Sequence, residues 1–173
     1  IVGLAPGLKG ANKTGRPFTG DYAGDLLYAT LGKFGFSDGT YASHADDGLV
    51  LRNCMITNAV RCVPPQNKPT PAEIRTCRPY FERRIETLPN LKVMLALGRI
   101  AHDQILSTFQ LRKTAYPFAH AAVHELHTPE TADGPSKPLW LVDSFHCSRY
   151  NTNTGRLTPQ MFDNVFETIK NLL

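Results

Sequence analysis

The chain has 173 residues, of which 42% are hydrophobic and 20% are charged, and this balance suits one globular domain with one sizeable core. No apolar run approaches the roughly 20 residues of a transmembrane helix, and the N-terminal residues lack the basic flank and long apolar stretch of a signal peptide. The net charge of +4 is too small to identify a nucleic-acid partner by itself, and four cysteines without dense spacing indicate a reducing compartment rather than a disulfide scaffold.

Buried strands and helices alternate in the first half of the chain. Residues 1–5 are apolar and end in a Pro-Gly turn, which predicts a buried strand, and the polar residues 8–20 predict a long loop. Apolar residues recur at helical spacing over 26–34. A polar, turn-like stretch at 37–48 then leads to an apolar run at 54–60, which predicts a second buried strand.

The second half continues this alternation and begins with a strong helix start. Thr70, Pro71 and Glu73 stand at the N-cap, N1 and N3 positions of a predicted helix, which is the pattern of a capping box. The remaining predicted elements are a strand at 93–97, a helix at 98–109, a surface loop at 126–138, a strand at 139–145 and a final helix at 158–172.

Nearly continuous apolar strands that alternate with helices are typical of a parallel sheet covered on both faces. We predict an α/β fold, a three-layer α/β/α sandwich with a central, mostly parallel four-stranded sheet, formed as a single domain over residues 1–173. Because the first strand starts without a lead-in, we expect that a segment upstream of it is missing from this chain. Ligands bind beyond the carboxyl ends of such strands, which selects the loops at 5–21, 58–69, 98–99 and 146–156.

The loop after the first strand carries the most unusual polar residues. Its glycines let backbone amides approach a ligand closely, Asn12 and Thr14 could bind a phosphate, and Phe18 offers a face for stacking. The segment matches neither a Walker loop nor a dinucleotide fingerprint. Basic loop residues such as Lys9 and Arg16 are interpreted as a solvated surface. A long loop with an aromatic ring and a carboxylate nevertheless favours a functional site.

Polar side chains also follow the second and fourth strands. Asn58 ends an apolar strand, where an amide is costly to bury unless it bonds a ligand or, as the alternative, the backbone of a neighbouring loop. His146 stands at the end of the last strand. A lone histidine is more often structural, but the basic-aromatic segment 148–151 behind it favours a functional role.

The cysteines form no complete metal motif. Cys62 and Cys77 have 14 residues between them, and two thiolates cannot hold a cubane iron–sulfur cluster, which takes four. Cys54 and Cys147 could be suggested as further ligands. However, Cys54 lies at the start of its predicted strand, away from Cys62, which argues against it.

Together these segments resemble the uracil-DNA glycosylase superfamily in its family 5 (type b) form, which is an iron–sulfur branch. Residues 3–7 resemble the first motif, and 15–21 resemble the glycine-framed loop that carries a stacking Phe. Residues 57–65 fit the same branch, and 146–158 resemble the second motif. The similarity runs from the first residue to the last helix.

The resemblance implies a DNA repair enzyme that hydrolyses the N-glycosidic bond of uracil and leaves an abasic site. Other deaminated or mismatched bases, such as hypoxanthine, xanthine and thymine, are further expected substrates. The first motif holds Leu4 and Ala5 where other families place an acid, and in family 5 a carboxylate matching Asp21 takes over. Catalysis is thus expected from Asp21, His146 and Asn58, which would orient water, stabilise charge on uracil O2 and bind the edge of the base. Asp46 and Asp47 are rival carboxylates.

The remaining expected contacts divide between base, DNA backbone and cluster. Contacts with the base are expected from Gly3, Ala5, Gly7, Phe18, Asn58 and His146. Contacts with DNA are expected from Asn12, Thr14 and Ser148, and from Arg149, Tyr150 and Asn151 as a wedge. The resemblance also implies a structural 4Fe–4S cluster on Cys62 and Cys77, with two more cysteines upstream of residue 1.

We expect an intracellular monomer whose partner is damaged DNA and which binds no membrane. The absence of an acid in the first motif leaves a non-catalytic DNA-binding module on the same fold as an alternative. A nucleotide- or phosphate-binding α/β protein unrelated to DNA is a second alternative.

Overall fold

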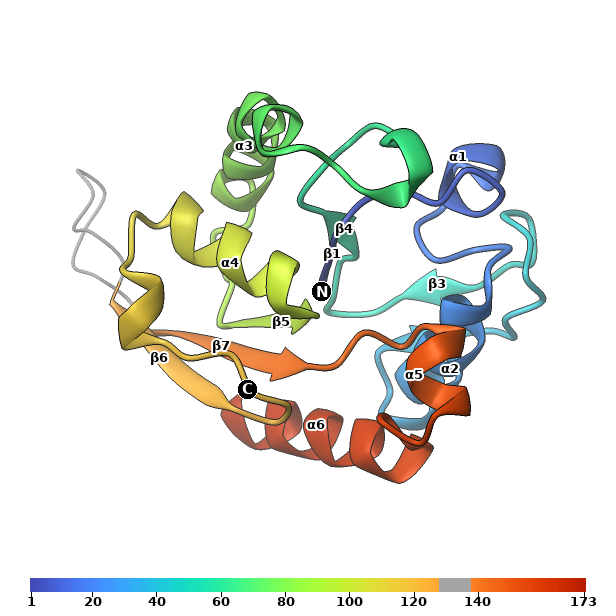
Figure 1. Ribbon diagram of the computed structural model, residues 1–173. Helices are drawn as coiled ribbons and strands as arrows, with labels where there is room; N and C mark the ends of the chain where they lie inside the picture. Colours follow the sequence, from blue (N-terminus) through green and yellow to red (C-terminus); the bar gives the residue numbers. More distant parts are fainter. Residues whose placement is uncertain (128–137) are drawn as a thin grey trace.

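The computed structural model describes residues 1–127 and 138–173, and its centre is a five-stranded sheet in the order β4-β1-β5-β7-β6 (Figure 1). The strands are β1 (Val2–Gly3), β4 (Thr57–Asn58), β5 (Val93–Leu97), β6 (Val123–His127) and β7 (Pro138–Ser144). All neighbours in the sheet are parallel except β6, which is antiparallel to β7. The predicted mostly parallel sheet is confirmed, with five strands instead of four.

Two predicted segments have other boundaries in the structure, and one strand was not predicted. Residues 126–138 were predicted as a loop, but Leu126 belongs to β6 and Pro138 opens β7, while 128–137 lie outside the described residues. The strand β6 was missed because it is a short edge strand in which histidines interrupt the apolar pattern. The strand predicted at 54–60 shrinks to β4, which pairs only with the two residues of β1.

Helices cover both faces of the sheet. They are α1 (Ala11–Thr14), α2 (Tyr22–Lys33), α3 (Pro71–Glu86), α4 (Arg99–Thr108), α5 (Arg149–Asn153) and α6 (Pro159–Leu172). Figure 1 shows α3 and α4 on one face and α6 on the other, with α2 beside α6. A small two-stranded sheet (Ser37–Asp38 and Val50–Leu51) and two 3-10 turns (Pro65–Asn67 and Lys113–Ala115) complete the fold. The short α1 occupies part of the predicted long loop at 8–20.

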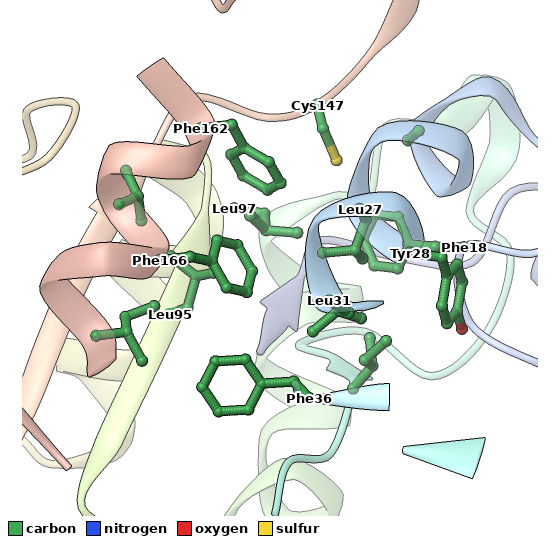
Figure 2. Packing of buried hydrophobic residues seen from close by; sticks show 14 of the residues in the cluster. Phe18, Leu27, Tyr28, Leu31, Phe36, Leu95, Leu97, Cys147, Phe162 and Phe166 are labelled. Atoms are coloured by element: carbon green, nitrogen blue, oxygen red, sulfur yellow. The ribbon is translucent and has the colours of Figure 1, made fainter. Parts of the chain in front are cut away.

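The alternation of side chains along β5 divides the core into two clusters. Leu95 and Leu97 point to the face covered by α2 and α6, and Met94 and Ala96 point to the face covered by α4. Figure 2 shows Leu97 between the aromatic side chains of α6 and the leucines of α2, and Leu95 beside Phe166. This arrangement confirms the predicted three layers.

Side-chain caps explain where the main helices begin. Thr70 and Glu73 form the predicted capping box at α3, where the Thr70 hydroxyl accepts from the Glu73 N–H at 3.2 Å and the Glu73 carboxylate accepts from the Thr70 N–H at 2.6 Å. Thr158 caps α6, and Asp21 caps α2. Because Asp21 is a cap, its position is fixed relative to the sheet. Within the described part of the chain, every helix is too short or too polar to cross a membrane.

Candidate active site

The carboxyl ends of β1, β4 and β7 border one cavity that is open to solvent. Its wall comes from four separate parts of the sequence: Leu4 to Ala11, Phe18 with Asp21 to Ala23, Asn58, and His146 with Ser148 and Arg149. A second cavity of about 100 Å³ lies at the opposite ends of the strands and is lined mostly by apolar side chains. Of these two cavities, the first brings together Phe18, Asp21, Asn58 and His146, which were selected for chemistry from the sequence.

Asp21 presents its carboxylate to the glycine-rich loop. One oxygen accepts a hydrogen bond from the Gly24 N–H at 3.3 Å, as expected of an N-cap. The other faces the loop so closely that a Cβ added at Gly10 would lie 2.5 Å from it, and one at Gly7 would lie 3.6 Å away. Glycine at position 10 therefore lets the carboxylate reach into the cavity.

Asn58, the last residue of β4, holds a buried acceptor without a partner. Its Oδ1 atom has no hydrogen bond within the described residues, although the residue is only 9% exposed. Such an unpaired group costs about 1–3 kcal/mol unless something binds it. A Cβ at Gly3 would collide with this oxygen and with the ring of Phe18, so glycine is needed there. The amide is thus poised to bind a donor in the cavity.

Phe18 forms a side of the cavity in an unusual conformation. Its φ of +55° lies in the left-handed region, which costs a non-glycine residue about 1–3 kcal/mol. Its ring lies 5.9 Å from the ring of His146, centre to centre. A flat apolar face and an imidazole therefore border the same space as Asn58.

His146 lies two residues beyond the end of β7, and the chain around it is held firmly. The Asn151 side-chain amide donates to the His146 carbonyl at 2.8 Å, and the Phe145 N–H donates to Nδ1 of His120 at 3.2 Å. Burial lowers the pKa of His146, while the negative charge of Asp21 raises it in part. The ring is therefore neutral at neutral pH and can still donate one hydrogen bond.

Of the predicted wedge residues, Arg149 lines the cavity and Tyr150 and Asn151 follow it on α5, but the three do not all face the same way. Arg149 packs over the ring of Tyr22 at 5.1 Å, and Tyr150 is 71% exposed. Ser148 caps α5 by accepting from the Asn151 N–H at 3.4 Å. Asn151 points inward to His146, so in this structure it supports the loop, and its role as a wedge stays a prediction.

The predicted phosphate contacts at α1 lie outside the cavity wall. Asn12 is exposed, and the Thr14 hydroxyl lies 3.1 to 3.2 Å from the carbonyls of Gly10, Arg16 and Thr19. This hydroxyl therefore closes the loop on itself. Tyr22 and Lys9 also line the cavity, which was not predicted from the sequence. The position of Tyr22 directly after Asp21 was the one feature that could have indicated its place there.

The rival carboxylates lie elsewhere. Asp47 forms two hydrogen bonds of 2.7 Å with the guanidinium of Arg16, and Asp46 is exposed on the same loop. Neither contributes to the cavity wall. Arg16 is thus an internal anchor instead of the solvated surface residue that its loop position suggested, and Asp21 is the carboxylate that meets the cavity.

A second polar group, which the sequence did not indicate, lies inside the sheet beside α4. Nδ1 of His102 lies 2.7 Å from one carboxylate oxygen of Asp143, and Nε2 of His124 lies 3.3 Å from the other. Nε2 of His102 donates to the Tyr116 carbonyl at 2.9 Å. Both nitrogens of His102 are therefore used, and the ring has no lone pair free for a metal ion. In this structure the group joins α4 to β6 and β7.

The four cysteines are free thiols in separate places. Cys62 is exposed after β4 and Cys77 is half-buried on α3. Burial raises the pKa of Cys147 to about 12, and the Cys54 thiol donates to the Phe36 carbonyl. Cys54 is as half-buried as Cys77, but its thiol is already bonded to a carbonyl, whereas Cys62 and Cys77 fit half of the four-thiolate set that a cluster needs. The doubt about Cys54 as a ligand is consistent with this arrangement.

Comparisons with known proteins agree with this geometry. The family model described as the uracil DNA glycosylase superfamily matches residues 1–170. A type-5 uracil-DNA glycosylase of Thermus thermophilus is 45% identical over 172 residues, which cover 99% of this chain and 74% of that protein. One of Mycobacterium tuberculosis is 40% identical over 174 residues, covering 99% of this chain and 62% of that protein.

A more distant relative is a type-4 uracil-DNA glycosylase of Archaeoglobus fulgidus, which is 35% identical over 128 residues, 73% of this chain and 56% of that protein. The chain thus spans between 62% and 74% of the length of the two type-5 relatives described. The match of the family model and the identity to the Thermus protein establish that the chain belongs to the uracil-DNA glycosylase superfamily, in its type-5 branch.

Proposed function

We propose that this chain hydrolyses the N-glycosidic bond between uracil and deoxyribose in DNA and leaves an abasic site. The observation that carries the proposal is the unpaired acceptor of Asn58 in a cavity that also holds Phe18, His146 and Asp21. The polar edge of uracil offers an N–H donor beside carbonyl acceptors, which is what the Asn58 amide can pair with. The names of the type-5 relatives support the same activity.

The base must leave the DNA stack before it can enter the cavity. Extrusion costs a few kcal/mol and least at a mismatched base. We assign the wedge to Arg149 and Tyr150, which lie exposed at the rim, and the support of that loop to Asn151. Phe18 then stacks on the extruded base, an interaction usually worth about 1–3 kcal/mol.

Bond cleavage needs help on both sides of the glycosidic bond. As the bond between base and sugar breaks, its electron pair moves into the uracil ring and negative charge grows on O2, where a hydrogen bond from neutral His146 stabilises it. Positive charge grows on the sugar, and the carboxylate of Asp21 stabilises it and orients the attacking water. The water adds to the sugar carbon, and its proton is lost to solvent.

We also propose activity on hypoxanthine, xanthine or mismatched thymine. The support is Ala5, whose small side chain lines the cavity where other families carry a larger polar group. Duplexes with each base in turn test this point, and cleavage of uracil alone at saturating enzyme would refute it.

A 4Fe–4S cluster is a further proposal and takes no part in the hydrolysis. Cys62 and Cys77 would supply two ligands, and the other two would be cysteines upstream of Ile1. Such a cluster would fix the loop between β4 and α3 against the DNA. Iron and sulfide analysis of the purified protein, with Cys77→Ala as the variant that should lose both, tests the assignment. We further propose that the enzyme acts as a monomer on DNA inside the cell.

The decisive experiment is cleavage of a labelled duplex with one deoxyuridine, followed by alkali. The native chain should give product, and Asp21→Asn should lower kcat on the order of a hundredfold. Asparagine caps a helix as well as aspartate does, so this variant keeps the start of α2. Equal kcat in both would remove Asp21 from the mechanism, and no product from either would favour the non-catalytic DNA-binding module.

A further inference from the structure

Phe18 has a backbone conformation that its own residue type does not favour. Its φ is +55°, and its buried ring packs beside Gly3. A non-glycine residue stays in this region only where surrounding contacts hold it. The contacts that hold Phe18 therefore also decide where its ring lies in the cavity.

Two tyrosine hydroxyls hold the peptide groups on either side of Phe18. Tyr28 donates to the carbonyl of Pro17 at 2.7 Å, and Tyr41 donates to the carbonyl of Phe18 at 3.1 Å. The two tyrosine rings stack with their centres 4.5 Å apart. Because the orientations of these two peptide groups set φ and ψ of Phe18, the tyrosine pair fixes the turn.

Arg16 ties this turn to a distant segment of the chain. Its guanidinium donates to both carboxylate oxygens of Asp47 at 2.7 Å, and its Nε donates to the Thr19 hydroxyl at 2.7 Å. The guanidinium carbon lies 5.1 and 5.5 Å from the ring centres of Tyr28 and Tyr41. A guanidinium that is paired through two parallel bonds and packed on aromatic rings holds its neighbours in one geometry.

Both carboxylate oxygens of Asp47 accept hydrogen bonds within the protein. Its carboxylate also accepts from the N–H groups of Ala42 at 2.9 Å and Leu49 at 3.0 Å, and its side chain is 1% exposed. Hydrogen bonds from Arg16 hold the pKa of this carboxyl well below its usual range. The cavity wall is formed by other residues. An effect of Asp47 on the reaction would therefore be indirect, and Arg16 connects Asp47 to the turn at Phe18.

We propose that Arg16 and Asp47 form a positioning pair that, through Tyr28 and Tyr41, keeps Phe18 in its left-handed turn so that its ring stacks on the extruded base. The inference rests on the proposed function, because it concerns how the stacking residue of that reaction is held. Neither member of the pair lines the cavity, so both are positioning residues and not catalytic ones.

A double-mutant cycle tests this role. Phe18→Ala should lower kcat/KM on a uracil duplex roughly tenfold to a hundredfold, the usual size of stacking between a base and an aromatic ring. Asp47→Asn replaces one acceptor opposite Arg16 with a donor and should lower kcat/KM about fivefold to tenfold, chiefly by raising KM. In the Phe18→Ala background the same change at Asp47 should have almost no effect, since the ring that it positions is gone.

The chain offers a matched control. Asp163→Asn also removes a carboxylate paired with a cation, Lys33 at 2.6 Å, at the far end of α2, and it should leave kcat/KM unchanged. If Asp47→Asn does not fold, Tyr41→Phe replaces it, because that variant loses only the hydroxyl bonded to Phe18. It should give a smaller loss in the same direction, again absent in the Phe18→Ala background.

The outcomes separate the two proposals. A native kcat/KM in Asp47→Asn, or a loss that multiplies with that of Phe18→Ala, overturns the positioning pair. A native chain that leaves uracil in DNA overturns the proposed function instead. In that case the NMR coupling between the amide and α protons of Phe18 decides: it should change in Asp47→Asn and stay constant in Asp163→Asn, and constancy in both overturns the pair.

Discussion

The cavity and the buried polar group beside α4 contain similar side chains in opposite states. In the cavity, Asn58 Oδ1 has no partner among the described residues and His146 faces open space. In the buried group, both nitrogens of His102 and both carboxylate oxygens of Asp143 lie within hydrogen-bond distance of protein atoms. The cavity therefore holds a polar atom that the described residues leave unpaired, whereas the named polar atoms of the buried group are paired within the protein.

The contrast shows that residue type alone does not identify a site of chemistry. A buried histidine beside an aspartate is typical of active sites, yet here the pair joins α4 to β7 and has no free atom for a substrate. Unpaired buried groups raise the free energy of the folded state, so they persist where a ligand will pair them. The unpaired acceptor is therefore the better guide to function.

The largest expected effect is on stability and comes from Asp143→Ala. Removing one partner of a buried, hydrogen-bonded pair leaves Nδ1 of His102 and Nε2 of His124 without the carboxylate, so the free energy of unfolding should fall by about 3–5 kcal/mol. Urea denaturation measures it. Asp38→Ala is the control, because Asp38 pairs with Arg52 on the surface and should cost less than about 1 kcal/mol.

The activity of the same variant tests whether the buried group and the cavity are separate sites. Asp143→Ala should keep the kcat of the folded fraction, because the buried group borders no part of the cavity. A folded Asp143→Ala protein with little activity would mean that the buried group belongs to the catalytic site after all.

The next effect is on activity and comes from Asn58→Ala. Loss of the amide that pairs with uracil should lower kcat/KM roughly a hundredfold. The free energy of unfolding should stay constant or rise by about 1 kcal/mol, since an unpaired buried acceptor is removed. Asn164→Ala, on the exposed side of α6, should change neither quantity. A clear loss of stability in Asn58→Ala would show that its amide is paired inside the protein, as in the buried group.

Local patterns in the sequence predicted much of this molecule. The capping box at Thr70, the apolar run of β5 and the glycine-framed loop depend on neighbours a few residues apart, and they fix the layers and the strand ends. Because the carboxyl ends of parallel strands meet at one edge of a sheet, the sequence alone predicts that Asn58 and His146 lie close together.

Pairings between distant residues could not be predicted in this way. Arg16 and Asp47 are 31 positions apart, and nothing in either segment indicates the other. Asp143 lies in an apolar strand that predicts burial but not the identity of its partners. Asn151 points inward because its amide donates to the His146 carbonyl. Residue types do not indicate such a bond, because every residue carries a backbone carbonyl.

The smallest expected effect concerns protonation of His146. Burial lowers the pKa of this ring below its ordinary 6.5 in the folded chain. Between that lowered pKa and 6.5 the unfolded chain binds more protons than the folded one, so this residue makes the unfolding free energy fall as pH decreases through that window. Below the folded pKa both states are protonated, and its contribution no longer changes. Activity should fall in the same acid range, because the proposed mechanism uses the neutral ring of His146 to donate a hydrogen bond to uracil O2.

Asp21→Asn tests whether Asp21 and His146 act on each other within the cavity, and it keeps the cap of α2. The negative charge of Asp21 favours the protonated ring, so its loss should lower the pKa of His146 further and move the acid transition to lower pH. NMR titration of the imidazole protons measures the shift. His120 is the internal control, because burial also lowers its pKa but Asp21 does not act on it, and it should titrate as before. If the pKa of His146 stays constant or rises in this variant, carboxylate and imidazole are not electrically coupled, and the cavity is not the single catalytic site proposed for it.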